Sequence, residues 1–145
     1  MTLLLHGTCV AWPEGAVLIR GESGSGKSDL ALRLLDLGAH LVADDQVLLD
    51  ASEGRLTARP PETLAGLLEV RGIGILAVGH QPQAALKLVI DLVQEDRVER
   101  MPEPQTTSLE GIELPLYRLS PWPASAPSKV RLAMKTVTGS IISVS

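Results

Sequence analysis

The residues best suited to chemistry form a glycine-rich segment near the start of the chain. In order, they are Gly21, Glu22, Ser23, Gly24, Ser25, Gly26, Lys27 and Ser28, which fit the phosphate-loop pattern G-x-x-x-x-G-K-[ST] in full. Such a loop points backbone N–H groups at phosphate oxygens, with Lys27 on the β and γ phosphates and the Ser28 hydroxyl on Mg²⁺. The alternative is a glycine-rich turn with an incidental lysine. The apolar run before the segment and the amphipathic helix expected after it favour nucleotide-phosphate binding.

Two adjacent carboxylates, Asp44 and Asp45, form a second candidate cluster. The strand expected just before them should run parallel to the strand that leads into the phosphate loop, so it delivers both side chains beside the phosphates. One can hold Mg²⁺, and the other, its pKa raised by its neighbour, can take a proton from an attacking hydroxyl. The alternative is an exposed turn, where Asp is common. The pair predicts phosphoryl transfer without naming the acceptor, because water and alcohol nucleophiles need the same base.

Glu69 and Arg71 form the third cluster, on an expected strand where they alternate with apolar residues and so share one face. A carboxylate and a guanidinium suit a site with Mg²⁺ and phosphate, and the alternative is a surface ion pair. A lone histidine is usually a packing residue, and the residues alone give His6 no other role.

The elements expected around these residues make a strand-rich α/β domain that spans residues 1–145. Apolar runs predict a hairpin over residues 3–12 and 16–20 and a second over 46–50 and 55–59, with further strands at 40–43, 67–70, 73–78, 85–93 and 112–119. One helix is expected over residues 28–37, and another should follow Ser128 as its N-cap and end at Gly139. The charged, proline-rich residues 94–113 predict a mobile loop.

Composition excludes several classes of function. The 145 residues are 45% hydrophobic and only 2% aromatic, with two Trp, one Tyr and no Phe, so the core must be aliphatic and base-stacking grooves are not expected. A formal net charge of −4 argues against nucleic-acid binding, and no apolar run reaches the ~18 residues of a membrane span. The single cysteine, Cys9, is expected to be a buried apolar residue in a reduced, cytoplasmic protein.

The motifs, in their order along the chain, resemble the catalytic domain of bacterial HPr kinase/phosphorylase. The resemblance rests on His6-Gly7, the phosphate loop, the segment from Leu41 to Asp45, and Leu68-Glu69-Val70-Arg71-Gly72-Ile73-Gly74-Ile75. It covers about half of the chain. It implies a P-loop kinase domain that uses ATP or pyrophosphate to phosphorylate a serine of an HPr-like phosphocarrier of the sugar phosphotransferase system. It also implies the reverse phosphorylase reaction, in which inorganic phosphate removes that phosphate and yields pyrophosphate.

The resemblance also implies roles at matched positions. Lys27, the loop amides and Arg71 would bind phosphates, and Ser28 and Glu69 would hold Mg²⁺. Asp45, supported by Asp44, would act as base in the kinase direction and as acid in reverse, with either carboxylate able to move the proton. His6 would add an acid/base group or a phosphate contact. A homo-oligomer is expected on the same grounds.

Two departures from the family pattern are visible. The motif histidine is already residue 6, so the usual N-terminal domain is expected to be absent, as in a short form found in some proteobacteria whose partner belongs to a nitrogen-linked phosphotransferase branch. The family's arginine in a Pro-Gly-Arg-Asn-type segment has no clear match in residues 120–131, where Lys129 and Arg131 are the candidate substitutes. In the family this arginine bears on the phosphorylase half of the activity and on regulation by metabolites, so the departure concerns both.

Two other functions fit the same residues. A small-molecule kinase or NTPase would need an aromatic or Arg-lined substrate pocket, and a non-catalytic ATP sensor would gate a partner through residues 94–113. The poverty of aromatic residues further predicts that the site reads phosphates more than bases.

Overall fold

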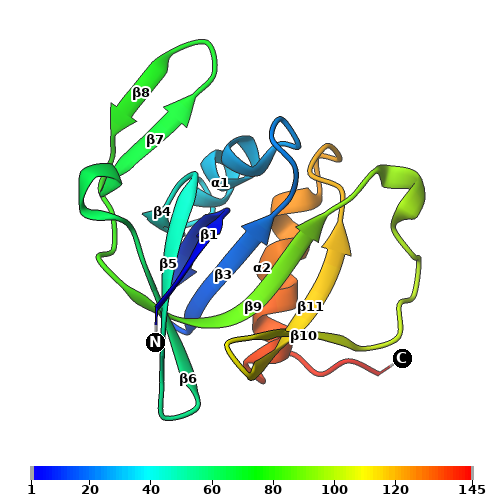
Figure 1. The fold of residues 1–145 in the computed structure, drawn as a ribbon. Coiled ribbons are helices and arrows are strands. Elements are labelled where there is room, and N and C mark those ends of the chain that lie inside the picture. The colour runs from blue at the N-terminus through cyan, green and yellow to red at the C-terminus, as the bar shows by residue number, and fades with distance from the viewer. Residues whose placement is uncertain (1, 145) are drawn as a thin grey trace.

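A nine-stranded sheet organises the protein, and its central strands β3 (Gly15–Arg20) and β9 (Ala84–Leu92) run parallel to each other (Figure 1). The computed structural model describes residues 2–144. The strand order is β1-β5-β6-β9-β3-β2-β4, and β11 also pairs in parallel with β9 and antiparallel with β10. The remaining strands of this sheet are β1 (Thr2–His6), β2 (Thr8–Trp12), β4 (His40–Ala43), β5 (Gln46–Ser52), β6 (Arg55–Arg59), β10 (Gln105–Leu109) and β11 (Ile112–Leu119).

The core lies on both faces of the sheet. Helices α1 (Lys27–Leu35) and α2 (Ala126–Val137) cover one face, on the far side of the sheet in Figure 1. Side chains alternate along β3, so that Val17 and Ile19 join the core on the helix side while Ala16 and Leu18 join the core under β5, β6 and β11. Both cores are dominated by aliphatic side chains, as the composition predicted, and Cys9 is fully buried.

A separate two-stranded sheet, β7 (Leu67–Val70) and β8 (Gly74–Ala77), projects from the main sheet as a hairpin (Figure 1). Leu68 and Val70 anchor β7 in the helix-side core, whereas β8 is exposed along its whole length. Ile73 and Ile75 are 72% and 70% exposed. The hairpin is therefore attached by one strand and presents an apolar surface with the other.

The prediction that residues 3–12 form a single strand of the first hairpin is wrong. Residues 3–12 do not form one strand but two, because the chain breaks at Gly7. β2 forms the expected hairpin with β3, while β1 leaves it and pairs antiparallel with β5. A β-carbon on Gly7 would lie 3.0 Å from the carbonyl oxygen of Ile19, so this turn has no room for a side chain.

The predicted mobile loop and the start of the last helix also need correction. Residues 94–113 contain a strand, β10, which pairs with β11 across the turn at Glu110 and Gly111. Its polar residues hid it from the hydrophobic pattern, since four of its five positions are not buried. α2 begins at Ala126 with Ser125 as N-cap, so Ser128 is already inside the helix. Two short 3-10 turns complete the chain, η1 (Glu62–Leu64) and η2 (Glu95–Arg97).

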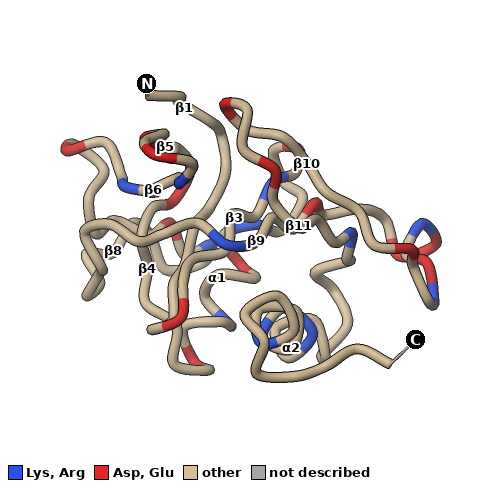
Figure 2. Tube along the Cα trace, turned by 90° about the horizontal axis from the view of Figure 1, so that it is seen from below, with Lys and Arg blue, Asp and Glu red and all other residues tan. Residues whose placement is uncertain are grey.

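Charged residues are scattered over the fold. Figure 2 shows Lys and Arg interspersed with Asp and Glu along the trace. Within residues 2–144, no helix has both the length and the apolar character needed to cross a membrane.

Candidate active site

The phosphate loop connects β3 to α1 and leaves the first amides of α1 without a side-chain cap. Gly26 has φ 101° and is the N-cap residue of α1, where no side chain caps the first amides of the helix. These amides therefore remain available to an anion at the positive end of the helix. The Lys27 ammonium donates to the carbonyls of Gly21 at 2.7 Å and Glu22 at 3.0 Å, so it lies across the loop.

Asp44 is buried behind the loop and acts as a hydrogen-bond hub. It is 6% exposed, and its Oδ1 accepts hydrogen bonds from the Ser28 hydroxyl at 2.8 Å and the Thr8 hydroxyl at 2.9 Å. The backbone N–H of Glu69 donates to its other oxygen at 3.3 Å. One carboxylate thus joins β2, the start of α1 and the β7–β8 hairpin.

Asp45 is the opposite of its neighbour, because its side chain is exposed and no residue of the described chain makes a hydrogen bond or ion pair with it. Its backbone is left-handed, with φ 70°, which turns the chain sharply between β4 and β5. The Gly7 N–H donates to its carbonyl at 3.1 Å, and His6 is paired with Gln46 in the β1–β5 ladder. The break at Gly7 therefore places His6 beside Asp45.

A cavity of about 630 Å³ gathers most of the candidate residues, and we name it the Asp45 cavity. Its lining includes His6, Gly21, Ser23, Gly24, Gly26, Lys27, Ser28, Asp45, Glu69 and Arg71. Asp44 lies beneath this lining, and Glu22 and Ser25 line a different cavity. Three clusters that are far apart in sequence therefore share one hollow at the edge of the sheet.

One predicted direction is confirmed and one predicted position was wrong. β4 does not lie next to β3: β2 separates them and is antiparallel to both, so β4 still runs in the same direction as β3 and still ends beside the loop. Arg71 is not on the strand with Glu69 but follows it in the hairpin turn. Both side chains nevertheless line the Asp45 cavity.

The chemistry of the site fits a nucleotide phosphate and Mg²⁺. The Ser25 hydroxyl is buried with no partner among residues 2–144, and the uncapped amides of α1 add further donors. Residues 2–144 hold no cluster of three or more His, Cys, Asp or Glu side chains placed for a metal ion. A Mg²⁺ site does not require such a cluster, since Mg²⁺ is usually held by one or two carboxylates plus water and substrate phosphates. Ser28 and Glu69 could supply such oxygens.

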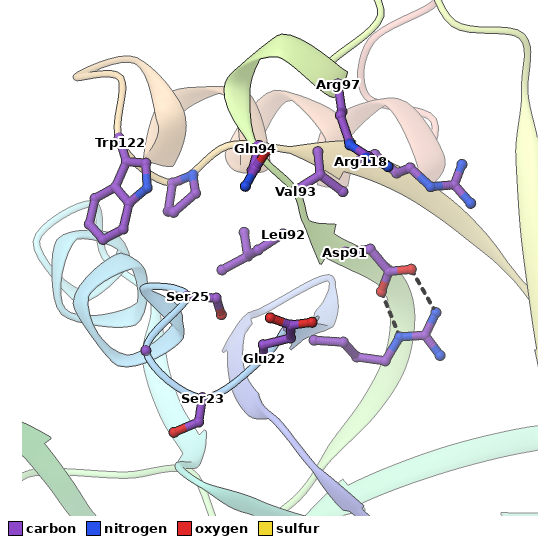
Figure 3. Close-up of a pocket in the computed structure, with 14 residues that line it drawn as sticks. Glu22, Ser23, Ser25, Asp91, Leu92, Val93, Gln94, Arg97, Arg118 and Trp122 are labelled. Carbon is purple, nitrogen blue, oxygen red and sulfur yellow. Dashed lines mark hydrogen bonds and ion pairs between the residues drawn. The ribbon is translucent and has the colours of Figure 1, made fainter.

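A second cavity, of about 680 Å³, lies on the other flank of the phosphate loop (Figure 3), and we name it the Arg97 cavity. Arg20 and Asp91 form a bidentate pair at 2.7 and 3.0 Å on its wall, joining the ends of β3 and β9. Arg97 and Arg118 approach from the opposite side in Figure 3. Trp122 and three loop residues line both cavities.

Several of these residues were missed from the sequence. Thr8 supports Asp44 from another strand, and no local pattern marks it. Arg97 sits in the segment that was predicted to be a loop. Arg118 shares one face of β11 with buried Leu114 and Leu116, but it is exposed near the end of the strand. Period-two alternation would therefore have placed Arg118 on the buried face, and the parallel pairing of β9 with β11 is what brings it near the phosphate loop.

The candidate arginine substitutes lie elsewhere. Arg131 forms an ion pair with Glu14 at 2.9 Å and lies over the Trp12 ring at 4.6 Å, away from both cavities. Lys129 is exposed on α2 and also lines neither cavity. The arginines beside the phosphate loop are instead Arg20, Arg71, Arg97 and Arg118.

Comparison with known proteins assigns the fold and the family. A structure of the HPr(Ser) kinase/phosphatase from Coxiella burnetii superposes with a TM-score of 0.79 at 27% identity, over 92% of this chain and 99% of that one. HPr kinase/phosphorylase from Variovorax paradoxus is 40% identical over 121 residues, which is 74% of this chain and 38% of that protein. The enzyme of the same name from Bordetella pertussis is 37% identical over 129 residues, 81% of this chain and 42% of that protein.

The chain thus spans about two fifths of the curated relatives it matches. The family model described as HPr Serine kinase C-terminal domain matches residues 1–125, which include all four motifs. The predicted strand-rich α/β fold is confirmed. The chain belongs to the HPr serine kinase C-terminal domain family.

Proposed function

We propose that this protein is a cytoplasmic protein serine kinase that uses ATP or pyrophosphate to phosphorylate an HPr-like phosphocarrier of the phosphotransferase system. The observation that supports it most directly is the exposed Asp45 carboxylate in one cavity with Lys27 and Ser28. A base that is exposed beside a phosphate loop can reach a hydroxyl carried in by another protein. The names of the relatives supply the carrier, HPr, and the serine.

In the proposed reaction the serine oxygen of the carrier attacks the terminal phosphorus of the donor. The new oxygen–phosphorus bond forms as the bond to the leaving phosphate oxygen breaks, and Asp45 takes the serine proton. Lys27 and the N–H groups of the loop bind the phosphate oxygens and stabilise the negative charge that develops on them. Asp44 does not move the proton in this scheme, because it is buried and already accepts three hydrogen bonds.

Mg²⁺ is the ion proposed to neutralise the phosphates when it is bound. Ser28 and Glu69 are its proposed ligands, and Asp44 orients the Ser28 hydroxyl through their 2.8 Å hydrogen bond. His6 and Arg71 are proposed to contact the transferred phosphate, since both line the cavity without an ion-pair partner among residues 2–144.

The reverse phosphorylase reaction is proposed for the same residues. An oxygen of inorganic phosphate attacks the phosphorus of the phosphoserine, and the bond from that phosphorus to the serine oxygen breaks. Asp45, protonated by the incoming hydrogen phosphate, gives its proton to the serine oxygen, and the pyrophosphate that has formed is released. The same carboxylate can serve both directions because a base that has accepted a proton is the acid of the reverse step. Arg71, Arg97 and Arg118 offer positive charge beside the loop for the second phosphate, in place of the family arginine.

A homo-oligomer also belongs to this proposal. The side chains of Ile73 and Ile75 are exposed on the β7–β8 hairpin, which also carries Glu69 and Arg71, and they support a protein–protein contact there. Light scattering of the purified chain over a range of concentrations tests it.

The deciding experiment incubates the protein with a purified HPr-like carrier, Mg²⁺ and ATP labelled at the γ phosphate. We expect phosphoserine on the carrier, lost in Lys27→Ala and in Asp45→Asn. Glu62→Gln, an exposed residue that lines neither cavity, is the matched control and should retain full transfer.

Other outcomes would contradict the proposal in distinct ways. Transfer that persists in both variants would overturn the assignment of the site. A labelled small molecule in place of the carrier would indicate a small-molecule kinase, and tight ATP binding with no transfer would indicate a sensor. Pyrophosphate as donor, and phosphorylated carrier with inorganic phosphate, test the two remaining reactions.

A further inference from the structure

Two cavities flank one phosphate loop, and the proposed base and metal ligands line only one of them. The Asp45 cavity holds Lys27, Ser28 and the carboxylates, so the reacting terminal phosphate belongs there. Loop residues Gly21, Ser23 and Gly24 line both cavities. A polyphosphate that starts at Lys27 and follows the loop backbone therefore ends at the Arg97 cavity, where the rest of a nucleotide would have to lie.

We propose that the Arg97 cavity is the nucleoside subsite and that the Trp122 ring is the surface on which the base stacks. This inference rests on the proposed use of ATP, and it names the group that distinguishes ATP from pyrophosphate as a donor. It assigns a role to a residue that lies outside every motif of the sequence.

The lining of the cavity has the chemistry of a nucleoside site. Its volume of about 680 Å³ lies within the range of small-molecule sites, roughly 300–1,000 Å³. Leu92 and Val93 give it apolar surface, and Gln94 offers both a donor and an acceptor to the edge of a base. Arg97 and Arg118 make no ion pair with a carboxylate among residues 2–144. Arg118 donates a hydrogen bond to the neutral Gln105 side chain, so both guanidinium charges remain near the phosphates that join the base.

Trp122 is exposed and yet firmly held. Its side chain is 62% exposed, whereas Pro121 beside it is buried. Arg33 of α1 donates hydrogen bonds to the carbonyls of Pro121 and Pro123, on both sides of the tryptophan. The same guanidinium forms an ion pair with Asp29 at 3.0 Å. The ring is therefore presented by a fixed backbone, which lowers the entropy lost when a base stacks on it.

The ring also lies directly against the phosphate loop. A β-carbon on Gly26 would lie 3.1 Å from Trp122 Cη2 and 3.0 Å from Pro121 Cγ. In Figure 3 the indole lies at one end of the cavity, above the loop that carries Ser23 and Ser25. The sequence predicted weak base selectivity because aromatic residues are few. Trp122, one of the three aromatic residues, nevertheless lies beside the loop at the entrance to the proposed nucleoside subsite.

The test compares two ligands that share phosphates and differ in the nucleoside. Isothermal titration calorimetry with Mg²⁺ measures the binding of ATP and of tripolyphosphate to the wild type, Trp122→Ala and Trp122→Phe. We expect Trp122→Ala to weaken ATP roughly 5- to 150-fold, the range of one base–aromatic stack, and tripolyphosphate by less than about twofold. Trp122→Phe keeps a ring and should bind ATP nearly as the wild type does.

Three results would overturn the inference. An equal loss for both ligands would mean that the ring supports the loop rather than the base. Unchanged ATP binding in Trp122→Ala would place the nucleoside elsewhere, and so would equal binding of ATP and tripolyphosphate by the wild type. The test needs no carrier, so a split between the ligands without transfer would overturn only the proposed kinase activity.

Discussion

Asp44 and Asp45 are consecutive in the chain and belong to two groups with opposite environments. The inner group, Thr8, Ser28 and Asp44, is joined by hydrogen bonds of 2.8 and 2.9 Å around a buried carboxylate. The outer group, His6, Asp45, Glu69 and Arg71, is exposed and lines the cavity. The left-handed backbone at Asp45 separates the two groups, because it turns the Asp45 carboxylate toward the surface while that of Asp44 stays buried.

The difference teaches how adjacent residues of one type can take separate tasks. A buried carboxylate with satisfied hydrogen bonds positions its partners, whereas an exposed one is free to exchange a proton with a substrate. The sequence left open which of the two moves the proton, and their surroundings favour Asp45. Variants of the two carboxylates should therefore differ in stability: loss of Asp44 should lower it, whereas loss of Asp45 should lower activity and leave stability unchanged.

The largest effect is expected from Asp45→Asn. Loss of the general base should lower kcat for carrier phosphorylation by about 10²- to 10⁴-fold. Asparagine tolerates the left-handed backbone at this position, so the melting temperature should stay within about 2 °C of the wild type. Single-turnover transfer and thermal unfolding measure the two quantities. A variant that unfolds early would show that Asp45 also supports the fold and would break the division between the groups.

Asp44→Ala, unlike Asp45→Asn, should lower the stability of the fold. It removes the acceptor of the Thr8 hydroxyl, the Ser28 hydroxyl and the Glu69 N–H, so the free energy of unfolding should fall by about 1–3 kcal/mol. Urea denaturation measures it, with Asp45→Asn as the matched control that should remain stable.

The buried thiol of Cys9 gives the Asp44 prediction a local readout. Cys9 pairs with Ala43 just before Asp44, and burial raises the pKa of its thiol to about 12. A thiol reagent should therefore leave the wild type unlabelled at pH 8 and label Asp44→Ala faster, as the β2–β4 pair opens. Equal labelling of the two proteins would mean that Asp44 does not hold these strands together.

Glu69→Gln tests the outer group from the other side of the cavity. If the carboxylate holds Mg²⁺, its loss should raise the Mg²⁺ concentration needed for half-maximal transfer roughly 10- to 100-fold, a typical cost for a partner of a metal site. Stability should not change, because the backbone N–H of Glu69, and not its side chain, contacts Asp44. An unchanged Mg²⁺ requirement would remove Glu69 from the proposed ligands.

The four motifs could be predicted from the sequence because each one is local. The phosphate loop needs only its own eight residues and the strand and helix beside it, and most strand bounds followed from apolar runs. The break at Gly7 could not be predicted, since it depends on β1 pairing with β5, some forty residues away. β10 was missed because its pairing with β11 holds it and its own residues are polar.

The contents of the site divide in the same way. The roles proposed for Lys27 and Ser28 follow from the local loop pattern, whereas Thr8 and Trp122 reach the site through tertiary contacts. Arg131 is the opposite case: the sequence offered it as a site residue, but a sequence cannot show that an arginine is already paired elsewhere. Its guanidinium lies between Glu14 and the Trp12 ring.

The ion pair of Glu14 with Arg131 lies outside both groups, so its loss serves as a control and should have the smallest effect on stability. A backbone hydrogen bond at Glu14, followed by the Arg131 guanidinium, holds the pKa of the Glu14 carboxyl below its ordinary value. A lowered pKa in the folded state means that this carboxylate stabilises the fold above its unfolded pKa, about 4.3, and that the gain is lost as pH falls through the folded value.

Glu14→Gln should therefore be less stable than the wild type at pH 7, by no more than about 1 kcal/mol for a partly exposed pair. The difference should shrink as the pH is lowered below about 4, and urea denaturation at both pH values measures it. Carrier phosphorylation should be unchanged at pH 7, since Glu14 and Arg131 line neither cavity. A loss of activity in Glu14→Gln would show that the Arg131 pair reaches the site through α2, and the division between the inner and outer groups would then be incomplete.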